Sequence, residues 1–220
     1  MNKLFTVGVL SFSLFLGACN DDEPADASNN EGSKEPKEVE TTEAHADEEK
    51  AQEPEVVTFE EAVEGDAIKN EYGTYTIVKA TDANQQHETG PIKFELKKVL
   101  LATFEPNEEN VFLFEEEGTK IPMNLAITLI ESENTSDDTV SFHPFTTRVT
   151  TETKGQYEAQ TYLNEGESEH VGNVIQEFVT PFNLGDEDLE SLTSLKFTFD
   201  PPSSESTING EEVQTEVTFE

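Results

Sequence analysis

The residue with the most distinctive chemistry in this sequence is Cys19, the single cysteine among 220 residues. It follows Leu16, Gly17 and Ala18, so a thiol stands directly after one aliphatic and two small residues. A thiolate is a soft nucleophile and forms a thioether readily. The small side chains of Gly17 and Ala18 leave the backbone open to a processing enzyme. The pattern predicts that Cys19 is itself modified, and a lone cysteine leaves no partner for an internal disulfide.

Residues 1–18 precede this cysteine with the layout of an export signal, because Lys3 is followed by the apolar run Leu4–Ala18. That run has about fifteen residues, whereas a helix needs roughly twenty to cross a bilayer. Leu16–Cys19 resembles the lipobox of bacterial lipoproteins. The resemblance implies a lipoprotein signal peptide over 1–18, cleavage before Cys19, and a diacylglyceryl group on the Cys19 sulfur. Two acyl chains hold a protein stably on a membrane, here on its extracellular face.

The charge of the chain is strongly negative, with 48 acidic and 13 basic residues and a formal net charge of −35. Nucleic-acid binding is excluded because phosphate recognition requires clustered Lys and Arg. Cationic partners, such as basic peptides or metal ions, are favoured electrostatically. A large negative charge also keeps a protein soluble, and this simpler explanation is preferred to a specific cation site.

Residues 19–56 have the composition of a disordered acidic linker. Between Asn20 and Val56 there are 14 acidic residues, three lysines and no aromatic residue. Such a segment buries too little apolar surface to offset the entropy of ordering. A flexible coil of this length spans roughly 35 Å, which suits a tether between a membrane and a domain.

Residues 57–220 show many short runs of alternating apolar and polar residues, which is typical of an antiparallel β-sandwich. The clearest run, Met123–Glu131, has apolar residues on both faces and predicts an inner strand. Polar residues predict a loop over Asp82–Gly90, and Asn209-Gly210 predicts a tight hairpin turn. Capping-box spacing predicts a helical turn at Phe59–Val63. The prediction is an all-β domain with one or two short helical turns, the structure of residues 105–122 staying open between a helical turn and an edge strand.

Three stretches of this domain resemble a family of Gram-positive surface lipoproteins of unknown function that carry an immunoglobulin-like, telokin-like domain. They include a strand followed by an Asn-Thr-Ser-Asp turn, a Gly before an aromatic residue, and a Gly-Glu turn: Leu125–Pro144, Thr151–Tyr157 and Leu163–Val174. Thr89–Lys93 also resembles the first core strand of the family. The resemblance implies an immunoglobulin-like sandwich at the cell surface. It supplies no catalytic residue.

Metal-binding residues give weak patterns. The four histidines have no partner at helical spacing and are expected to be solvated on the surface: His45, His87, His143 and His170. Four oxygen-bearing side chains lie close together in sequence and suggest a calcium loop: Asn183, Asp186, Asp188 and Glu190. The glycine and the twelfth-position glutamate of an EF-hand are missing. The preferred interpretation is therefore no metal and no other cofactor.

Enzyme signatures are also missing from the sequence, which has no Gly-x-Ser-x-Gly elbow, no Ser-x-x-Lys dyad and no phosphate-binding glycine loop. Four aromatic residues near one end of the predicted sandwich could line a pocket, although core packing is favoured: Phe142, Phe145, Tyr157 and Tyr162. The chain is predicted to be a non-enzymatic, lipid-anchored module that binds a protein, peptide or envelope ligand. An envelope hydrolase, a calcium-dependent module and a passive spacer stay open as alternatives.

Overall fold

The computed structural model of the chain describes residues 57–115, 119–205 and 207–220. The sequence-based predictions for the signal peptide, for Leu16, Gly17, Ala18 and Cys19, and for the linker lie outside these residues. No helix in the described ranges is long and apolar enough to span a membrane.

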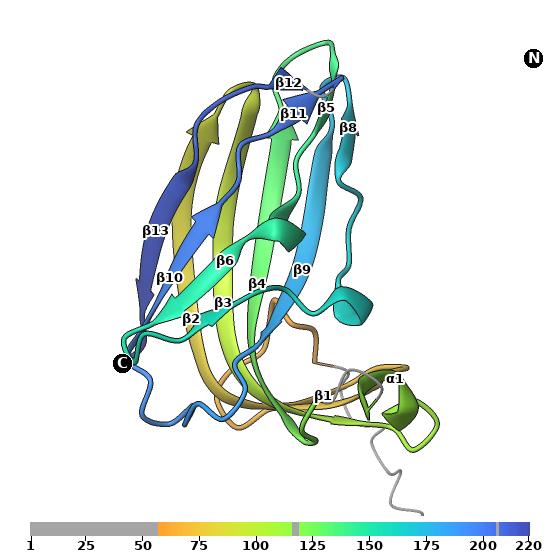
Figure 1. The fold of residues 1–220 in the computed structure, drawn as a ribbon, viewed down its shortest axis with the longest axis vertical. Helices are drawn as coiled ribbons and strands as arrows, with labels where there is room; N and C mark the ends of the chain where they lie inside the picture. Colours follow the sequence, from red (N-terminus) through yellow and green to blue (C-terminus); the bar gives the residue numbers. More distant parts are fainter. Residues whose placement is uncertain (1–56, 116–118, 206) are drawn as a thin grey trace, which may run out of the picture. The chain divides into compact units, whose positions relative to one another are not determined.

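The largest sheet has five antiparallel strands in the order β1-β2-β3-β4-β9 (Figure 1). Its strands are β1 (Ala67–Lys69), β2 (Gly73–Thr89), β3 (Ile92–Pro106), β4 (Met123–Asn134) and β9 (Ile175–Asn183). β2 and β3 are joined by a tight turn at Gly90-Pro91, where Gly90 has a positive φ of 56°. A side chain at Gly90 would collide with the backbone of Asn209, so glycine suits both the turn and this close approach.

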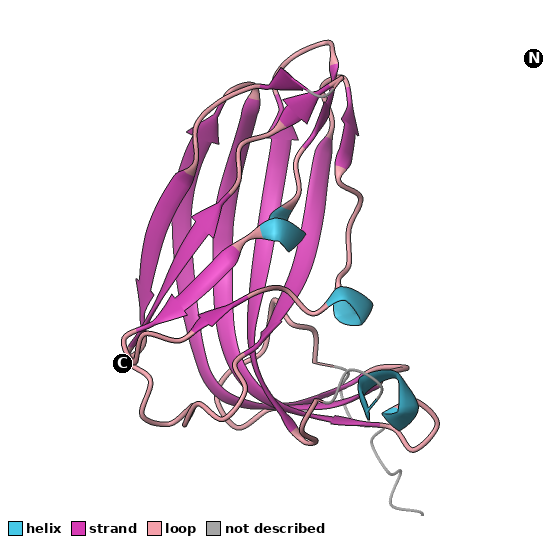
Figure 2. Ribbon diagram, in the orientation of Figure 1, coloured by secondary structure: helices cyan, strands magenta, loops and turns pink. Residues whose placement is uncertain are grey.

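A four-stranded sheet with the order β13-β10-β6-β7 packs against the large sheet, and a small sheet with the order β12-β11-β5-β8 lies at one end. The strands of the first are β6 (Arg148–Thr151), β7 (Gln156–Tyr157), β10 (Ser194–Phe199) and β13 (Val213–Thr218). Those of the small sheet are β5 (Thr139–Ser141), β8 (Glu169–Val171), β11 (Ser203–Ser204) and β12 (Thr207–Ile208). Helical segments are short: α1 (Val111–Glu115), η1 (Pro144–Thr146) and η2 (Thr161–Leu163) (Figure 2).

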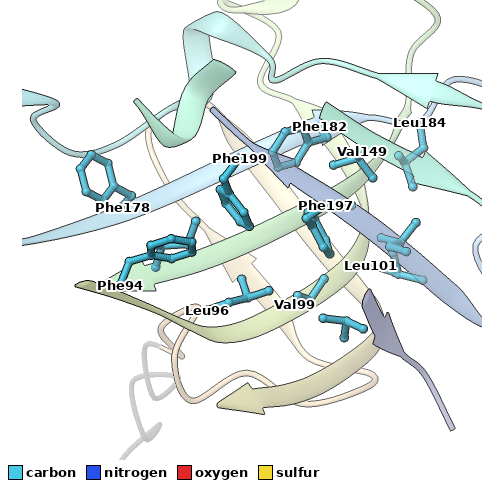
Figure 3. Close-up of a cluster of buried hydrophobic side chains, with 14 of the residues drawn as sticks. Phe94, Leu96, Val99, Leu101, Val149, Phe178, Phe182, Leu184, Phe197 and Phe199 are labelled. Atoms are coloured by element: carbon cyan, nitrogen blue, oxygen red, sulfur yellow. The ribbon is translucent and has the colours of Figure 1, made fainter. Parts of the chain in front are cut away.

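The main core lies between the two larger sheets and is rich in phenylalanine (Figure 3). Phe94 of β3 contacts Phe199 of β10, with ring centroids 4.9 Å apart. Phe182 of β9 lies 6.2 Å from Phe197 of β10, nearly edge to face. Such aromatic pairs add to the free energy of simple burial.

A β-bulge between Leu96 and Lys98 keeps β3 aligned with this core. The extra residue changes the alternation by one, so Phe94 and Leu96 before it and Val99 and Leu101 after it all face the main core. Leu100 and its neighbours consequently face the opposite side of the sheet.

That opposite side, here called the outer face, supports a second core over one half of its length. This covered half consists of apolar side chains of β1 to β4: Ile68, Tyr75, Ile77, Leu100, Ala102, Phe104, Met123, Leu125, Ile127 and Leu129. Phe114 of α1, Leu163 of η2 and Ala62 pack over it. Residues 57–66, here called the covering segment, make hydrogen-bonded turns from Thr58 to Ala62 and from Val63 to Asp66.

One edge of the sandwich is closed by side chains of β2 that reach the backbone of the β13 region. The Gln85 amide donates to the Glu216 carbonyl at 2.9 Å, and the Thr89 hydroxyl donates to the Glu211 carbonyl at 2.7 Å. At the opposite edge, Ala159 and Glu165 make isolated bridges to β9. Both contacts reduce the unpaired strand edge of the two larger sheets.

The prediction of an all-β antiparallel sandwich with short helical turns is confirmed. Within residues 105–122, which the sequence left open between a helical turn and an edge strand, the structure has the short helix α1. The loop predicted over Asp82–Gly90 is wrong, because β2 continues to Thr89 and its polar residues alternate between solvent and the sandwich interior. The hairpin turn predicted at Asn209-Gly210 is also wrong. These residues connect β12 to β13, which lie in different sheets.

Candidate functional site: the open half of the outer face

The outer face of the large sheet has a second half that no other element of the described chain covers with an apolar layer. This open half is formed by side chains that alternate with core-facing residues: Gln86, Glu88, Lys93, Glu95, Glu131, Glu133, Ile175 and Glu177. Alternation fixes their direction, because Phe94 and Ser132 between them are buried on the sandwich side.

Strand register places three glutamates side by side across the open half. Glu95 of β3 is opposite Glu131 of β4, and Glu131 is opposite Glu177 of β9. In the next row, Lys93 lies between Glu88 of β2 and Glu133 of β4. Like charges directly opposite one another destabilise a sheet, so the first row has an unfavourable arrangement.

Lys97 reduces part of this repulsion from its position in the β3 bulge. Its ammonium lies 2.7 Å from a Glu131 carboxylate oxygen and 3.4 Å from one of Glu177. The hydrogen bond with Glu131 raises the pKa of Lys97 above its ordinary value. Glu95 and Glu133 have no such cation at salt-bridge distance among the described residues. The surface over Glu95, Glu131 and Glu133, here called the groove, is therefore negatively charged.

Two neighbouring hollows indent this surface. The larger, of about 460 Å³, is lined by residues of β2, β3 and β4: Gln86, His87, Glu88, Lys93, Phe94, Glu95, Glu131, Ser132 and Glu133. The smaller, of about 210 Å³, lies between the covering segment and β9 and has a more apolar lining that includes Phe59, Leu129 and Val179. Lys97 and Glu177 line the smaller hollow, and their ion-pair network with Glu131 joins the two.

The histidines are placed differently from the prediction. His143 is exposed as expected, and His45 lies outside the described residues. His87 is half-buried, and burial lowers its pKa below the ordinary histidine value. His170 is wholly buried, so the prediction of a surface position is wrong for it. The reason is that β8 carries His170 on the same face as the core residues of the small sheet.

His170 forms a closed hydrogen-bonded pair with Ser132, which sequence reasoning missed. The Ser132 hydroxyl lies 2.7 Å from His170 Nε2, and His170 Nδ1 lies 3.1 Å from the Ser168 carbonyl. Since Nδ1–H must donate to that carbonyl, Nε2 of the neutral ring accepts a hydrogen bond from the Ser132 hydroxyl. Burial lowers the pKa of His170, although the bond to Ser168 opposes the shift. A serine and a histidine at this distance resemble a nucleophile and base, but Ser132 is only 1% exposed, so a substrate could reach very little of it even though it borders the larger hollow.

A polar residue at a core-facing position of β4 is the signal that could have found this pair. Ser132 follows Ile130 by two residues on β4 and is paired with Phe94 of β3, so it faces the same core as both. A buried hydroxyl at such a position requires a hydrogen-bond partner. Asn134 continues the same row, and its amide donates to the Asp138 carbonyl at 2.7 Å.

The four residues suggested as a calcium loop are not brought together as ligands. The carboxamide oxygen of Asn183 accepts the N–H of Gly185, and a carboxylate oxygen of Asp188 accepts the N–H of Glu190. Asp186 pairs instead with Lys120, at 2.6 Å. Across residues 57–115, 119–205 and 207–220, no group of three or more His, Cys, Asp or Glu side chains is arranged to hold a metal ion.

The four aromatic residues considered as a pocket have separate roles. Phe142 is buried in the main core, and Phe145 packs against Phe178 with ring centroids 5.6 Å apart. Tyr162 is 47% exposed on η2. Tyr157 donates to Glu187 at 2.8 Å, and its burial, together with that carboxylate, raises its pKa to about 12. The preference for core packing over a pocket is confirmed for Phe142.

No family model matches the sequence. The chain is similar to YonS, an SPbeta prophage-derived uncharacterized lipoprotein of Bacillus subtilis strain 168, with 28% identity over 161 residues that cover 71% of each chain. A conserved hypothetical protein from Bacillus anthracis has a TM-score of 0.41 and 8% identity, over 60% of this chain and 95% of its own. An uncharacterized β-sandwich protein from Clostridium difficile 630 has a TM-score of 0.31 and 12% identity, over 71% and 92%. None of the three names states an activity.

Proposed function

We propose that the chain is a lipoprotein of the extracellular face of the cell membrane that presents a non-enzymatic binding domain. Residues 1–18 act as the signal peptide, Cys19 carries the lipid, and residues 19–56 tether the domain of residues 57–220. The thiol after Leu16, Gly17 and Ala18 supports this assignment, and so does the similarity to a protein named as a lipoprotein. The resemblance to immunoglobulin-like surface domains belongs to the same proposal.

The observation that supports binding most strongly is the open half of the outer face. One half of this sheet face is apolar and covered, and the other half is charged and indented. An uncovered and hollowed half of this kind supports a role in binding a partner. The enclosed Ser132–His170 pair favours a structural role for that serine over hydrolysis. No observation favours the hydrolase or calcium-dependent alternatives specifically.

Lipid attachment is tested by replacing the thiol. In cells fed labelled palmitate, we expect the wild-type chain and an Asn20→Ser control to carry label in the membrane fraction. The Cys19→Ser chain is expected to lose the label, because an alcohol is a far weaker nucleophile than a thiolate. Label that persists on Cys19→Ser would contradict the anchor assignment.

Binding is tested with the unlipidated Cys19→Ser chain as a soluble bait on intact envelopes. We expect it to retain one partner in stoichiometric amount. An empty bait, repeated after crosslinking, would favour the passive spacer and would contradict the binding role while leaving the anchor intact.

A further inference from the structure

We propose that the open half of the outer face docks an extended basic peptide segment of a partner protein, with cationic side chains over the glutamate rows and one apolar side chain in the smaller hollow. This inference rests on the proposed binding function and names its surface and the class of its ligand.

The charge of the larger hollow selects a cation. Its lining contains four glutamates and one lysine, so its formal charge is −3 with His87 neutral. Lys97, the nearest further cation, is already paired with Glu131 and Glu177. Like charges therefore repel one another along the row Glu95–Glu131–Glu177, and a bound cation would reduce this repulsion. Electrostatic complementarity of this kind strengthens binding and speeds association.

The spacing of the carboxylates matches an extended chain. Glu131 and Glu133 are two residues apart on β4, so their Cα atoms are separated by about 6.8 Å along the strand. An extended peptide repeats its side chains on one face at the same interval of about 6.8 Å. A peptide lying along β4 can therefore place successive cationic side chains over Glu133 and Glu131, with Glu95 beside the second.

The smaller hollow distinguishes a peptide from a simple cation. It adjoins the Lys97–Glu177 pair and is lined by Phe59, Leu129 and Val179. Phe59 is fixed there by an edge-to-face contact with Tyr75 at 5.0 Å. Ile175, 63% exposed, lies beyond Glu177 on β9, opposite Glu133, and adds a separate apolar contact at that end of the glutamate rows. A ligand that carries both charges and an aliphatic side chain satisfies both surfaces at once.

The chain's own linker does not fit this surface. Between Asn20 and Val56 the net charge is −11, so the linker is repelled by the glutamate rows. A single divalent ion is a different proposal, and the described side chains do not converge as a metal site.

The test uses the full chain with Cys19→Ser and a fluorescent peptide of alternating sequence, Lys-Ser-Lys-Ser-Leu-Ser-Lys, whose lysines and leucine lie on one face when it is extended. The variant neutralises three groove carboxylates: Glu95→Gln, Glu131→Gln and Glu133→Gln. A matched control neutralises three exposed carboxylates elsewhere: Glu108→Gln, Glu158→Gln and Glu190→Gln. At low salt we expect the groove variant to raise the Kd about tenfold, from roughly 0.5 kcal/mol per charge, and the control to raise it less than about twofold.

Two further peptides test the parts of the proposal. Replacing Lys by Glu should abolish binding, and replacing Leu by Ser should weaken it about fivefold, through loss of one buried aliphatic side chain. Equal weakening by the two triple variants would overturn the proposed surface and reveal unspecific attraction. A calcium-induced thermal shift that the groove variant alone abolishes would instead assign the groove to a metal ion.

Failure here is separable from failure of the binding function. If the groove variant loses no affinity for the peptide and still captures the same envelope partner as the wild-type bait, the assigned surface is wrong and the binding function stands. If neither bait captures a partner, the function itself is contradicted. Urea unfolding of both triple variants confirms that they are folded before either result is interpreted.

Discussion

The covered and open halves of the outer face are built from the same long strands, yet they have opposite chemistry. On β4, Leu125 and Ile127 face the second core. Glu131 and Glu133 lie on the same face of the strand, beginning four residues after Ile127, and face solvent. The sheet is continuous across the boundary. The difference shows that burial here depends on what lies over the sheet. The covering segment lies over the apolar half, and its residues Thr58–Glu60 border the smaller hollow beside Lys97 and Glu177.

The boundary itself is held by two consecutive lysines in the β3 bulge. Lys98 is buried beneath the covering segment, and its ammonium donates to the carbonyls of Glu60 and Ala62 at 2.6 and 3.0 Å. Lys97 turns to the open half and binds Glu131 and Glu177. The bulge thus directs the Lys98 ammonium to the covering segment and the Lys97 ammonium to the glutamates of the groove.

The largest difference between the halves is expected for apolar truncation. Phe104→Ala should lower the free energy of unfolding by about 4 kcal/mol, because Phe104 is wholly buried between Tyr75 and Phe114. Ile175→Ala on the open half should change it by less than about 0.5 kcal/mol. Urea denaturation measures both, and similar losses would show that the open half is also a packed surface.

The next effect concerns the lysine that holds the cover. Lys98→Met should lower stability by about 2 kcal/mol, since it removes two hydrogen bonds from a charged donor. Glutamyl endopeptidase should then cut at Glu60 or Glu61 faster than in the wild type. Lys97→Met is the matched control and should leave this cleavage rate unchanged. Equal protection in both variants would mean that apolar contacts alone retain the covering segment.

A smaller effect is expected from the buried pair behind the open half. His170→Gln should cost about 1 to 2 kcal/mol at pH 8, where the neutral imidazole accepts from Ser132. Burial lowers the pKa of His170 in the folded state, so the unfolded chain binds the proton more readily. The wild type should therefore lose stability as pH falls below the unfolded value of about 6.5.

The variant checks the sign of this dependence. The stability gap between wild type and His170→Gln should narrow between pH 7 and pH 5 in urea titrations. A His87→Gln variant separates the second histidine whose pKa burial lowers. A gap that stays constant with pH would show that His170 titrates alike in both states.

The smallest effect has the opposite sign. Glu95→Gln should raise the free energy of unfolding by about 0.5 kcal/mol, because it removes a like charge opposite Glu131. Glu158→Gln, on an exposed carboxylate outside the groove, serves as the control. A gain that disappears in high salt supports the repulsion, and a loss of stability would argue that Glu95 is held by a contact in the free protein.

The covered half was largely predictable from sequence, and the open half was not. Apolar residues on both faces of Met123–Glu131 predict an inner strand because each face must be buried. The polar run Asp82–Gly90 gives the opposite signal, since a strand whose outer residues face water has the composition of a loop. The sequence could not predict the two rows of charged residues for a further reason. Glu95, Glu131 and Glu177 are far apart in sequence, and the strand register that brings them together depends on bulges.

The buried His170 illustrates a second limit. A short strand of three residues gives too little alternation to tell which side faces inward, so a histidine on it appears solvated. Its partner Ser132 has a clearer signal, because it shares the core-facing period of Ile130. The calcium loop failed for a related reason: Asn183 and Asp188 are spaced to cap turns, and spacing alone does not separate a cap from a ligand.

The closed edge beside β13 has a consequence for crowding. Proteins tethered to one plane meet their own copies far more often than molecules in free solution, and exposed strand edges then favour pairing into aggregates. Here the carbonyls of Glu211 and Glu216 already accept hydrogen bonds from Thr89 and Gln85 of the same molecule. Fewer acceptors remain for a neighbouring copy, so this edge is poorly suited to pairing with a strand of another molecule.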